Sequence, residues 1–217
     1  MQDVLSTIPM FRSLDDIALK NLSSHTVTRS FPKNAIIITD GDKSDSLYII
    51  QSGKVKVFLM NDSGKEVILN FQGSGEYFGE MALLDNEPRS ASIMTLEVSK
   101  FAIISKNDFL ACLRKHPEIA LEIIKNQSRR LRQLTENVKS LALMDVYGRV
   151  ARTLLSMAEP QNGKLVVTER LTQQDLANLV GSSREMVTRI FKELVTGGYI
   201  EVNKKQITIN EKLPSAW

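Results

Sequence analysis

Short apolar runs separated by turn residues dominate residues 1–106. The runs are NAIIIT, SLYIIQSGKVKVFLM, KEVILNF, ASIMTL and KFAIIS, and clusters of glycine, aspartate, asparagine and serine stand between them. Strands at this spacing, with no long helical pattern between them, are typical of an antiparallel sandwich or barrel. In SGKVKVFLM, valines alternate with Lys54 and Lys56, which predicts one buried face and one solvated face.

Residues 117–141 carry a single helical pattern. Pro117 suits the first turn of a helix, where its missing N–H group is not needed. A heptad stripe follows, with positions spaced alternately by four and three residues, at Ala120, Ile124, Gln127, Leu131, Leu134, Val138 and Leu141. Such a stripe is typical of a helix that packs against a parallel copy of itself. We expect a homodimer with this helix as its seam, and the alternative is a helix packed on its own domain.

The last segment, TQQDLANLVGSSREMVTRIFKELVTGGYI, predicts two short helices joined by a tight turn. Thr172 and Asp175 form one capping pattern, and Ser182 and Glu185 form a second. Gly181 lies between them and permits the positive φ of the turn. Two helices at this spacing are typical of a helix-turn-helix. The alternative is a hairpin of helices that only pack together.

Basic residues are in excess in the same C-terminal segment. The net charge is +3, and all of it falls after residue 138, because acidic and basic residues balance before that point. The stretch YIEVNKKQITI predicts a β-hairpin, a wing in which Lys204 and Lys205 are expected to meet phosphate. The C-terminal segment is thus predicted to bind double-stranded DNA.

Composition argues against several other classes of protein. Cys112 is the single cysteine and His25 and His116 lie far apart, so no metal, haem or iron–sulfur cluster is expected. The apolar runs are too short to span a membrane, and the N-terminus lacks the pattern of a signal peptide, so we expect a cytoplasmic protein. The sequence has no P-loop, no nucleophile elbow and no paired acids beside a histidine, so we do not expect an enzyme.

The stretch FGEMALLDNEPRSAS combines a carboxylate and a guanidinium with small residues. Gly79 precedes Glu80, and Arg89 is followed by Ser90 and Ala91. A guanidinium fork with neighbouring hydroxyl and N–H donors suits a phosphate, and a carboxylate suits a hydroxyl donor. Glycine lets the main chain approach a ligand closely. The alternative is an ordinary ion pair between Glu80 and Arg89 that caps a turn.

This stretch and GSSREMVTRIFKELVTGGYI make the chain similar to bacterial transcription regulators of the cyclic-AMP receptor protein/FNR superfamily. The resemblance covers essentially the whole chain and implies an α+β fold. The expected parts are a jelly-roll-like, cyclic-nucleotide-binding β-roll over residues 1–116, a dimerisation helix over 117–141 and a winged helix-turn-helix over 142–217. The resemblance also implies that Glu80 contacts the ribose hydroxyl and that Arg89 and Ser90 contact the cyclic phosphate. The implied site comprises Gly79, Glu80, Met81, Arg89, Ser90 and Ala91.

At the base of the ligand, the sequence departs from the family pattern. The resemblance places Leu134 and Thr135 where those receptors present a threonine and a serine to adenine, and Leu134 lacks a hydroxyl. Cyclic AMP is the first expectation for the allosteric ligand. Cyclic GMP, cyclic di-GMP and a protein active without ligand stay open.

For DNA, the resemblance implies that the second helix reads bases with Arg184, Glu185 and Arg189. Arginine pairs with guanine O6 and N7, and glutamate accepts from cytosine N4. Phosphate contacts are expected from Thr172, Gln173, Ser183 and Lys192. The implied operator is a palindrome with TGTGA-like half-sites, and RNA polymerase is an expected partner. The alternative of another class is a nucleotide-binding module that regulates a protein partner.

Overall fold

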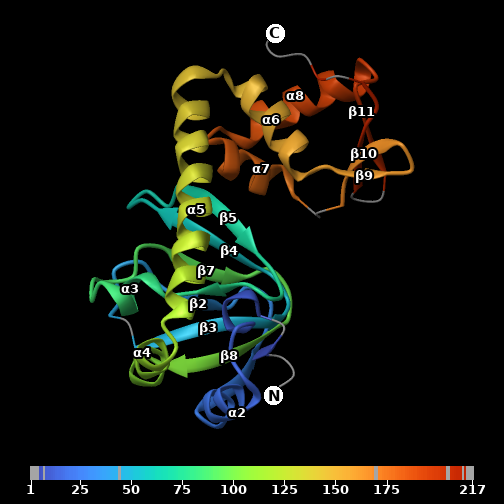
Figure 1. Cartoon of the computed structure of the whole chain (residues 1–217). Helices are drawn as coiled ribbons and strands as arrows, with labels where there is room; N and C mark the ends of the chain where they lie inside the picture. The colour runs from blue at the N-terminus through green and yellow to red at the C-terminus, as the bar shows by residue number, and fades with distance from the viewer. Residues whose placement is uncertain are drawn as a thin grey trace. The chain divides into compact units, whose positions relative to one another are not determined.

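The computed structural model describes residues 5–6, 8–43, 45–168, 171–203, 206–211 and 213. The chain divides into two compact units, Met1–Arg132 and Gln133–Trp217. The long helix α5 (Glu118–Leu143) begins in the first unit and ends in the second (Figure 1). Lys204 and Lys205, the expected phosphate contacts of the wing, lie outside the described residues.

Two four-stranded antiparallel sheets form the core of the first unit (Figure 1). One sheet has the order β1-β8-β3-β6, made of Thr26–Phe31, Ser99–Ser105, Ser46–Ser52 and Tyr77–Phe78. The other has the order β2-β7-β4-β5, made of Ile36–Ile38, Ser92–Thr95, Val55–Met60 and Glu66–Gln72. Both sheets contribute to one buried cluster, which comprises Ile38, Ile50, Val55, Phe78, Ile93 and Phe101. The predicted β-roll is confirmed.

The face of β4 opposite its valines is more buried than the alternation predicts. Lys56 is 9% exposed, its ammonium group pairs with Glu66, and it lies 4.7 Å from the centroid of the Phe58 ring. An ammonium group is buried where an opposite charge and an aromatic face offset its desolvation. The alternation therefore located the strand correctly, but the prediction of a solvated face is wrong at Lys56.

Helical segments and the sheet β1-β8-β3-β6 share a second buried cluster in the first unit. The segments are η1 (Pro9–Phe11), α2 (Asp16–Ser24), α4 (Lys106–Lys115) and the first turns of α5. A further short helix, α3 (Met81–Leu84), connects β6 to β7. Ile119 and Ile123 of α5 are buried in this cluster, so the beginning of α5 packs on its own domain.

A second face of α5 carries apolar side chains that stay exposed on the single chain. They are spaced as heptad positions, and Val138 is 65% exposed; the set comprises Ile124, Leu131, Leu134, Val138 and Leu141. Gln127 belongs to the same predicted stripe, but it is half-buried and its side-chain amide reaches a carboxylate of the first unit. α5 therefore has one face against its own domain and another, apolar face that is open.

The second unit is a winged helix-turn-helix, as predicted. Its helices are α6 (Val146–Met157), α7 (Gln173–Val180) and α8 (Arg184–Thr196). Its sheet has the order β11-β12-β10-β9, made of Ile200–Asn203, Gln206–Ile209, Lys164–Val167 and Glu159–Gln161. All three helices and the sheet share one buried cluster, which includes Val150, Leu154, Val167, Leu176, Val187, Leu194 and Ile207.

The turn between α7 and α8 agrees with the sequence prediction except for one cap. The capping box of Thr172 and Asp175 is present, and Gly181 ends α7 with φ of 64°. The prediction that Ser182 caps the second helix is wrong, because Ser183 accepts the hydrogen bond from the Met186 N–H. The Ser182 N–H donates instead to Ala177 O at 2.9 Å, so this serine closes the first helix.

Two arginines of α6 fix neighbouring elements of the second unit. Arg152 Nη1 donates to Glu136 O at 2.7 Å and Nη2 donates to Glu136 Oε2 at 3.1 Å. Arg149 Nε donates to Val180 O, the end of α7, at 2.7 Å. Asp145, between α5 and α6, caps α6 by accepting from the Gly148 N–H. The last turns of α5 are thus tied through α6 to the helix-turn-helix.

Candidate functional site

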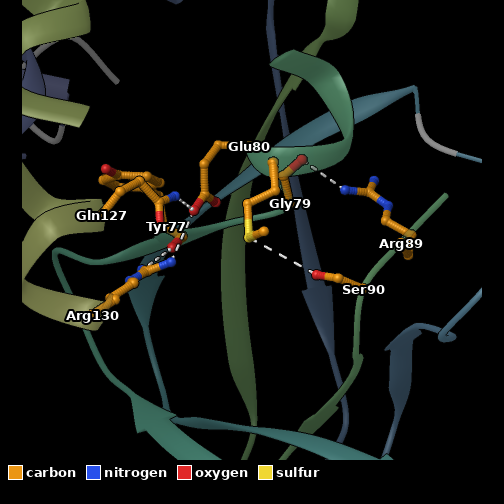
Figure 2. Close-up of polar contacts among 8 residues, drawn as sticks. Tyr77, Gly79, Glu80, Arg89, Ser90, Gln127 and Arg130 are labelled. Carbon is orange, nitrogen blue, oxygen red and sulfur yellow. Dashed lines mark hydrogen bonds and ion pairs between the residues drawn. The ribbon is translucent and has the colours of Figure 1, made fainter. Parts of the chain in front are cut away.

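Glu80 lies where β6 ends and α3 begins, and it is 1% exposed. Its Oε1 accepts hydrogen bonds from Gln127 Nε2 at 2.6 Å and from Arg130 Nη1 at 2.9 Å (Figure 2). Arg130 Nη2 also donates to Tyr77 O at 2.9 Å. A buried carboxylate requires charge pairing and hydrogen bonds, and Arg130 supplies both. The alternative in which Glu80 pairs with Arg89 is wrong, because the carboxylate pairs with Arg130.

The side chain of Tyr77 lies beside this ion pair as a neutral phenol. Burial, and to a lesser extent the charge of Glu80, raise the pKa of Tyr77 to about 12. The guanidinium carbon of Arg130 lies 5.4 Å from the centroid of the Tyr77 ring. The Tyr77 phenol is therefore neutral at neutral pH beside the ion pair of Glu80 and Arg130.

Arg89 precedes β7 and is held by main-chain carbonyls. It is 6% exposed, Nη1 donates to Gly79 O at 2.8 Å, and Nη2 donates to Ser46 O at 2.8 Å. Figure 2 shows Arg89 directed towards Gly79. Within the described part of the chain, no carboxylate lies within ion-pair distance of this guanidinium. Burial disfavours the charged form and lowers the pKa of Arg89. A buried cation whose direct partners are neutral is suited to an anionic ligand.

Gly79 is required by the position of Arg89. Its φ is 87°, a conformation that side chains rarely adopt, and a Cβ at this position would lie 2.3 Å from Arg89 Nη1. From the sequence, Gly79 was expected to let the main chain approach a ligand closely. In the structure, the residue that approaches it closely is the guanidinium itself.

The other predicted site residues of the first unit gather around Gly79. The Ser90 hydroxyl is exposed and lies 3.9 Å from Met81 Sδ (Figure 2). Met81 is exposed, and Ala91, the residue before β7, is half-buried. Leu134 and Thr135 are exposed residues of α5 that belong to the second unit. The first unit therefore brings six of the eight predicted ligand residues into one region.

Arg130 and the role of Gln127 were missed by the sequence analysis. Arg130 was not singled out, and Gln127 was assigned to the dimer seam. A signal was available, because Ile119, Ile123, Gln127 and Arg130 are spaced by four, four and three residues and therefore share one helix face. The two isoleucines of that face are buried, which brings the amide and the guanidinium to Glu80.

The predicted base-reading residues share one exposed region of α8. Arg184, Glu185 and Arg189 are exposed, while Val187, Ile190 and Leu194 are buried on the opposite face. Hydrogen bonds from its own main chain and from Ser183 lower the pKa of Glu185, which keeps the carboxylate charged as an acceptor. Ser183 stands at the N-cap of α8, and Lys192 is exposed on the same helix.

The two predicted phosphate contacts of α7 lie beside α8. Thr172 is the N-cap residue of α7, and Gln173 is its first residue. Gln173 Oε1 accepts from Thr188 Oγ1 at 2.6 Å, so this glutamine also links the two helices. The residues predicted to contact DNA in the second unit therefore come from the start of α7 and the exposed face of α8.

Two other kinds of feature are absent from the described residues. No group of three or more His, Cys, Asp or Glu side chains there is arranged to hold a metal ion. Likewise, none of the helices described is both long and apolar enough to cross a membrane.

The fold and these two sites define a class of protein. A β-roll with a buried charge cluster, followed by a long helix and a winged helix-turn-helix, is the architecture of a regulator that couples a small ligand to DNA. Family models agree for both ends of the chain. Residues 28–116 match the cyclic nucleotide-binding domain, and residues 148–212 match the Crp-like helix-turn-helix domain.

Relatives and solved structures agree with this class. The chain is 31% identical to the CRP-like cAMP-activated global transcriptional regulator of Mycobacterium tuberculosis (strain ATCC 25618 / H37Rv), over 97% of this chain and 96% of that protein. It is 32% identical to the cAMP-activated global transcriptional regulator CRP of Salmonella typhimurium, over 89% of this chain and 94% of that protein. The c-di-GMP responsive global regulator CLP of Xanthomonas campestris superposes with a TM-score of 0.76 at 30% identity, over 91% of this chain and 100% of that chain. The chain belongs to the CRP/FNR family of cyclic-nucleotide-responsive, DNA-binding transcription regulators.

Proposed function

We propose that the protein is a homodimeric regulator that binds cyclic AMP in its first unit and a palindromic, TGTGA-like operator with its second. The observation that carries the proposal is the buried guanidinium of Arg89, whose direct hydrogen-bond partners are main-chain carbonyls. Cyclic AMP is the first choice because relatives from Mycobacterium and Salmonella are named cAMP-activated. Cyclic di-GMP is the second candidate, because the Xanthomonas regulator responds to it.

The proposed binding mode uses the guanidinium of Arg89 and the carboxylate of Glu80. The cyclic phosphate binds the Arg89 fork and the exposed Ser90 hydroxyl, with main-chain N–H groups near Gly79, Met81 and Ala91 as further donors. The ribose 2′-hydroxyl donates to Glu80. Both hydrogen bonds that Glu80 accepts from Gln127 and Arg130 fall on Oε1, which favours Oε2 as the acceptor for the ligand. Because both partners are on α5, a ligand that contacts Glu80 acts on the helix that carries the predicted seam.

Regulation follows from the continuity of α5. The ligand shifts an equilibrium between two arrangements of this helix only by its different affinity for each. The last turns of α5 are tied to the helix-turn-helix through Arg152 and Glu136. A movement of the seam therefore changes the separation of the two copies of α8, which must match about one turn of DNA, roughly 34–36 Å.

The proposal predicts ligand-dependent binding to DNA. We expect cyclic AMP to strengthen binding of the protein to a duplex with two TGTGA half-sites, and we expect the affinity to fall steeply with salt. Fluorescence anisotropy titrations with and without the nucleotide measure this directly. Equal affinity in both titrations would exclude control by cyclic AMP. Binding of the nucleotide without binding of any duplex would instead favour a module that regulates a protein partner.

The proposed homodimer leads to a second prediction, about a substitution in its seam. Val138 is 65% exposed at a seam position of α5, so Val138→Glu should raise the dimer dissociation constant by about 100-fold or more, because two valines leave the interface and two like charges replace them. Sedimentation velocity over a concentration series measures the change. The matched control is Gln133→Glu, which adds the same charge at an exposed position outside the stripe. Equal dissociation constants for the two variants would rule out this seam.

The remaining parts of the proposal concern partners and location. A regulator of this family acts on transcription rather than on a chemical substrate, so we infer that the protein is not an enzyme. RNA polymerase is the inferred protein partner at promoters, and the cytoplasm, where bacterial DNA is found, is the inferred location.

A further inference from the structure

Two carboxamide side chains of β5 face the interior of the β-roll. The strand register pairs Asn70 with Val57 and Gln72 with Val55. Paired residues of neighbouring antiparallel strands point to the same face of a sheet. Val55 is buried in the cluster between the two sheets, and Val57 packs against it. Asn70 and Gln72 therefore point to the side of the sheet that faces this core.

Both carboxamides hold a buried oxygen for which the described residues supply no hydrogen-bond partner. The atoms are Asn70 Oδ1 and Gln72 Oε1, and Gln72 is 2% exposed. A buried polar atom without a partner is costly, and protein cores rarely retain one that leucine or valine would replace. Two of them, two residues apart on one face of one strand, favour a ligand that supplies the missing donors.

The position of Asn70 fits the base of a nucleotide whose phosphate is bound by Arg89. In the same sheet, Val57 also pairs with Ile93 of β7, so Asn70 and Ile93 flank Val57 in one row. Two strand spacings separate Asn70 from Ile93, which is about 10 Å. Ala91 lies two residues before Ile93, next to Ser90 and Arg89. A phosphate held by Arg89 and Ser90 thus leaves the interior face of β4 and β5 for the base.

We propose that Asn70, with Gln72 behind it, recognises the adenine edge of the cyclic nucleotide. A carboxamide presents an acceptor next to a donor. On one edge adenine presents the complementary pair, the N6 amino group beside N7, whereas the N7 and O6 of guanine on the same edge are both acceptors. This inference rests on the proposed function and assigns base selection to β5. It gives the base a polar partner although Leu134 of α5 has no hydroxyl.

The test compares two ligands that differ in the N6 amino group. Calorimetry measures the affinity of the full-length protein for cyclic AMP and for the 3′,5′-cyclic phosphate of purine riboside, which lacks that group. The wild-type protein should prefer cyclic AMP by about 10-fold or more. Asn70→Leu should reduce this preference to less than about threefold, because cyclic AMP loses its contacts at both N6 and the ring nitrogen, whereas the purine analogue loses only the contact at the ring nitrogen. The matched control is Asn107→Leu, at an exposed position on α4, which should keep the wild-type preference.

A second measurement separates recognition from stability. Asn70→Leu removes a buried polar atom without a partner, so the ligand-free variant should unfold at a temperature no lower than the wild type. If the leucine variant does not fold, Asn70→Ser, whose short side chain withdraws from the base, replaces it in the same comparison. A variant that is folded and keeps the wild-type preference would overturn the inference, and so would a wild-type protein that favours cyclic GMP over cyclic AMP. A wild-type protein that binds none of these nucleotides would refute the proposed function itself, and the inference with it.

Discussion

Replacing Arg89 with alanine should weaken binding of cyclic AMP by about 10- to 100-fold or more. Each charge-assisted hydrogen bond from the guanidinium to the phosphate contributes about 1.5–3 kcal/mol, and alanine removes the whole fork. The guanidinium is already buried and oriented by Gly79 O and Ser46 O, so the wild-type protein does not order this side chain when the ligand binds. Isothermal calorimetry on the purified variant measures the change in affinity.

The experiment must distinguish the loss of a ligand contact from a loss of folding stability. Alanine leaves the carbonyls of Gly79 and Ser46 without their donors, which should lower the free energy of unfolding by about 1–3 kcal/mol. Chemical unfolding therefore accompanies the calorimetry. Arg89→Lys keeps the charge but loses the fork, and it should bind with intermediate affinity. The surface control is Arg114→Ala on α4. A folded Arg89→Ala protein with wild-type affinity would show that the phosphate does not bind at this guanidinium.

Much of the fold was predictable because its determinants are local. Gly181 is at the turn of the helix-turn-helix, and Thr172 with Asp175 forms the capping box, as their residue types predict. Where two neighbouring residues offer the same chemistry, the sequence does not distinguish them. Ser182 and Ser183 are both good caps, and the dihedral angles of the main chain decide that Ser183 starts α8. Lys56 shows a different limit, because the ion pair that buries its ammonium group comes from Glu66 on the neighbouring strand β5, and the alternation of residues along β4 alone does not reveal this partner.

The candidate site was predictable in part for a related reason. Glu80 and Arg89 stand in one stretch of sequence, so a single motif indicated both. Their partners are distant in sequence: Arg130 binds Glu80, and the carbonyl of Ser46 binds Arg89. One face of α5 packs on its own domain and another is exposed. The apolar heptad stripe in the sequence indicated only the exposed face. The polar residues of the other face became interpretable only when the burial of Ile119 and Ile123 showed what that face contacts.

Replacing Arg184 with alanine should relax base preference as well as weaken binding to the operator. Arg184 is the first residue of α8 and is exposed, and the N-terminal residues of a recognition helix meet base edges in the major groove. A lost bidentate contact to guanine costs about 1–3 kcal/mol in each half-site. A dimer on a palindrome loses the contact twice, so the total is about 2–6 kcal/mol, or about 30- to 20,000-fold in affinity. Anisotropy titrations with the TGTGA palindrome measure the loss.

Specificity for one base, rather than affinity alone, distinguishes this role from a phosphate contact. In a second duplex, one G·C pair of each half-site is replaced. The wild-type protein should bind this duplex more weakly than the original one, whereas Arg184→Ala should bind the two duplexes about equally well. Lys192→Ala is the comparison, because a lost phosphate contact weakens binding to both duplexes equally and reduces the salt slope by about one per half-site. If Arg184→Ala behaved like Lys192→Ala, with full base preference and a shallower salt slope, then Arg184 would be a phosphate contact, and the reading of guanine would have to come from Arg189.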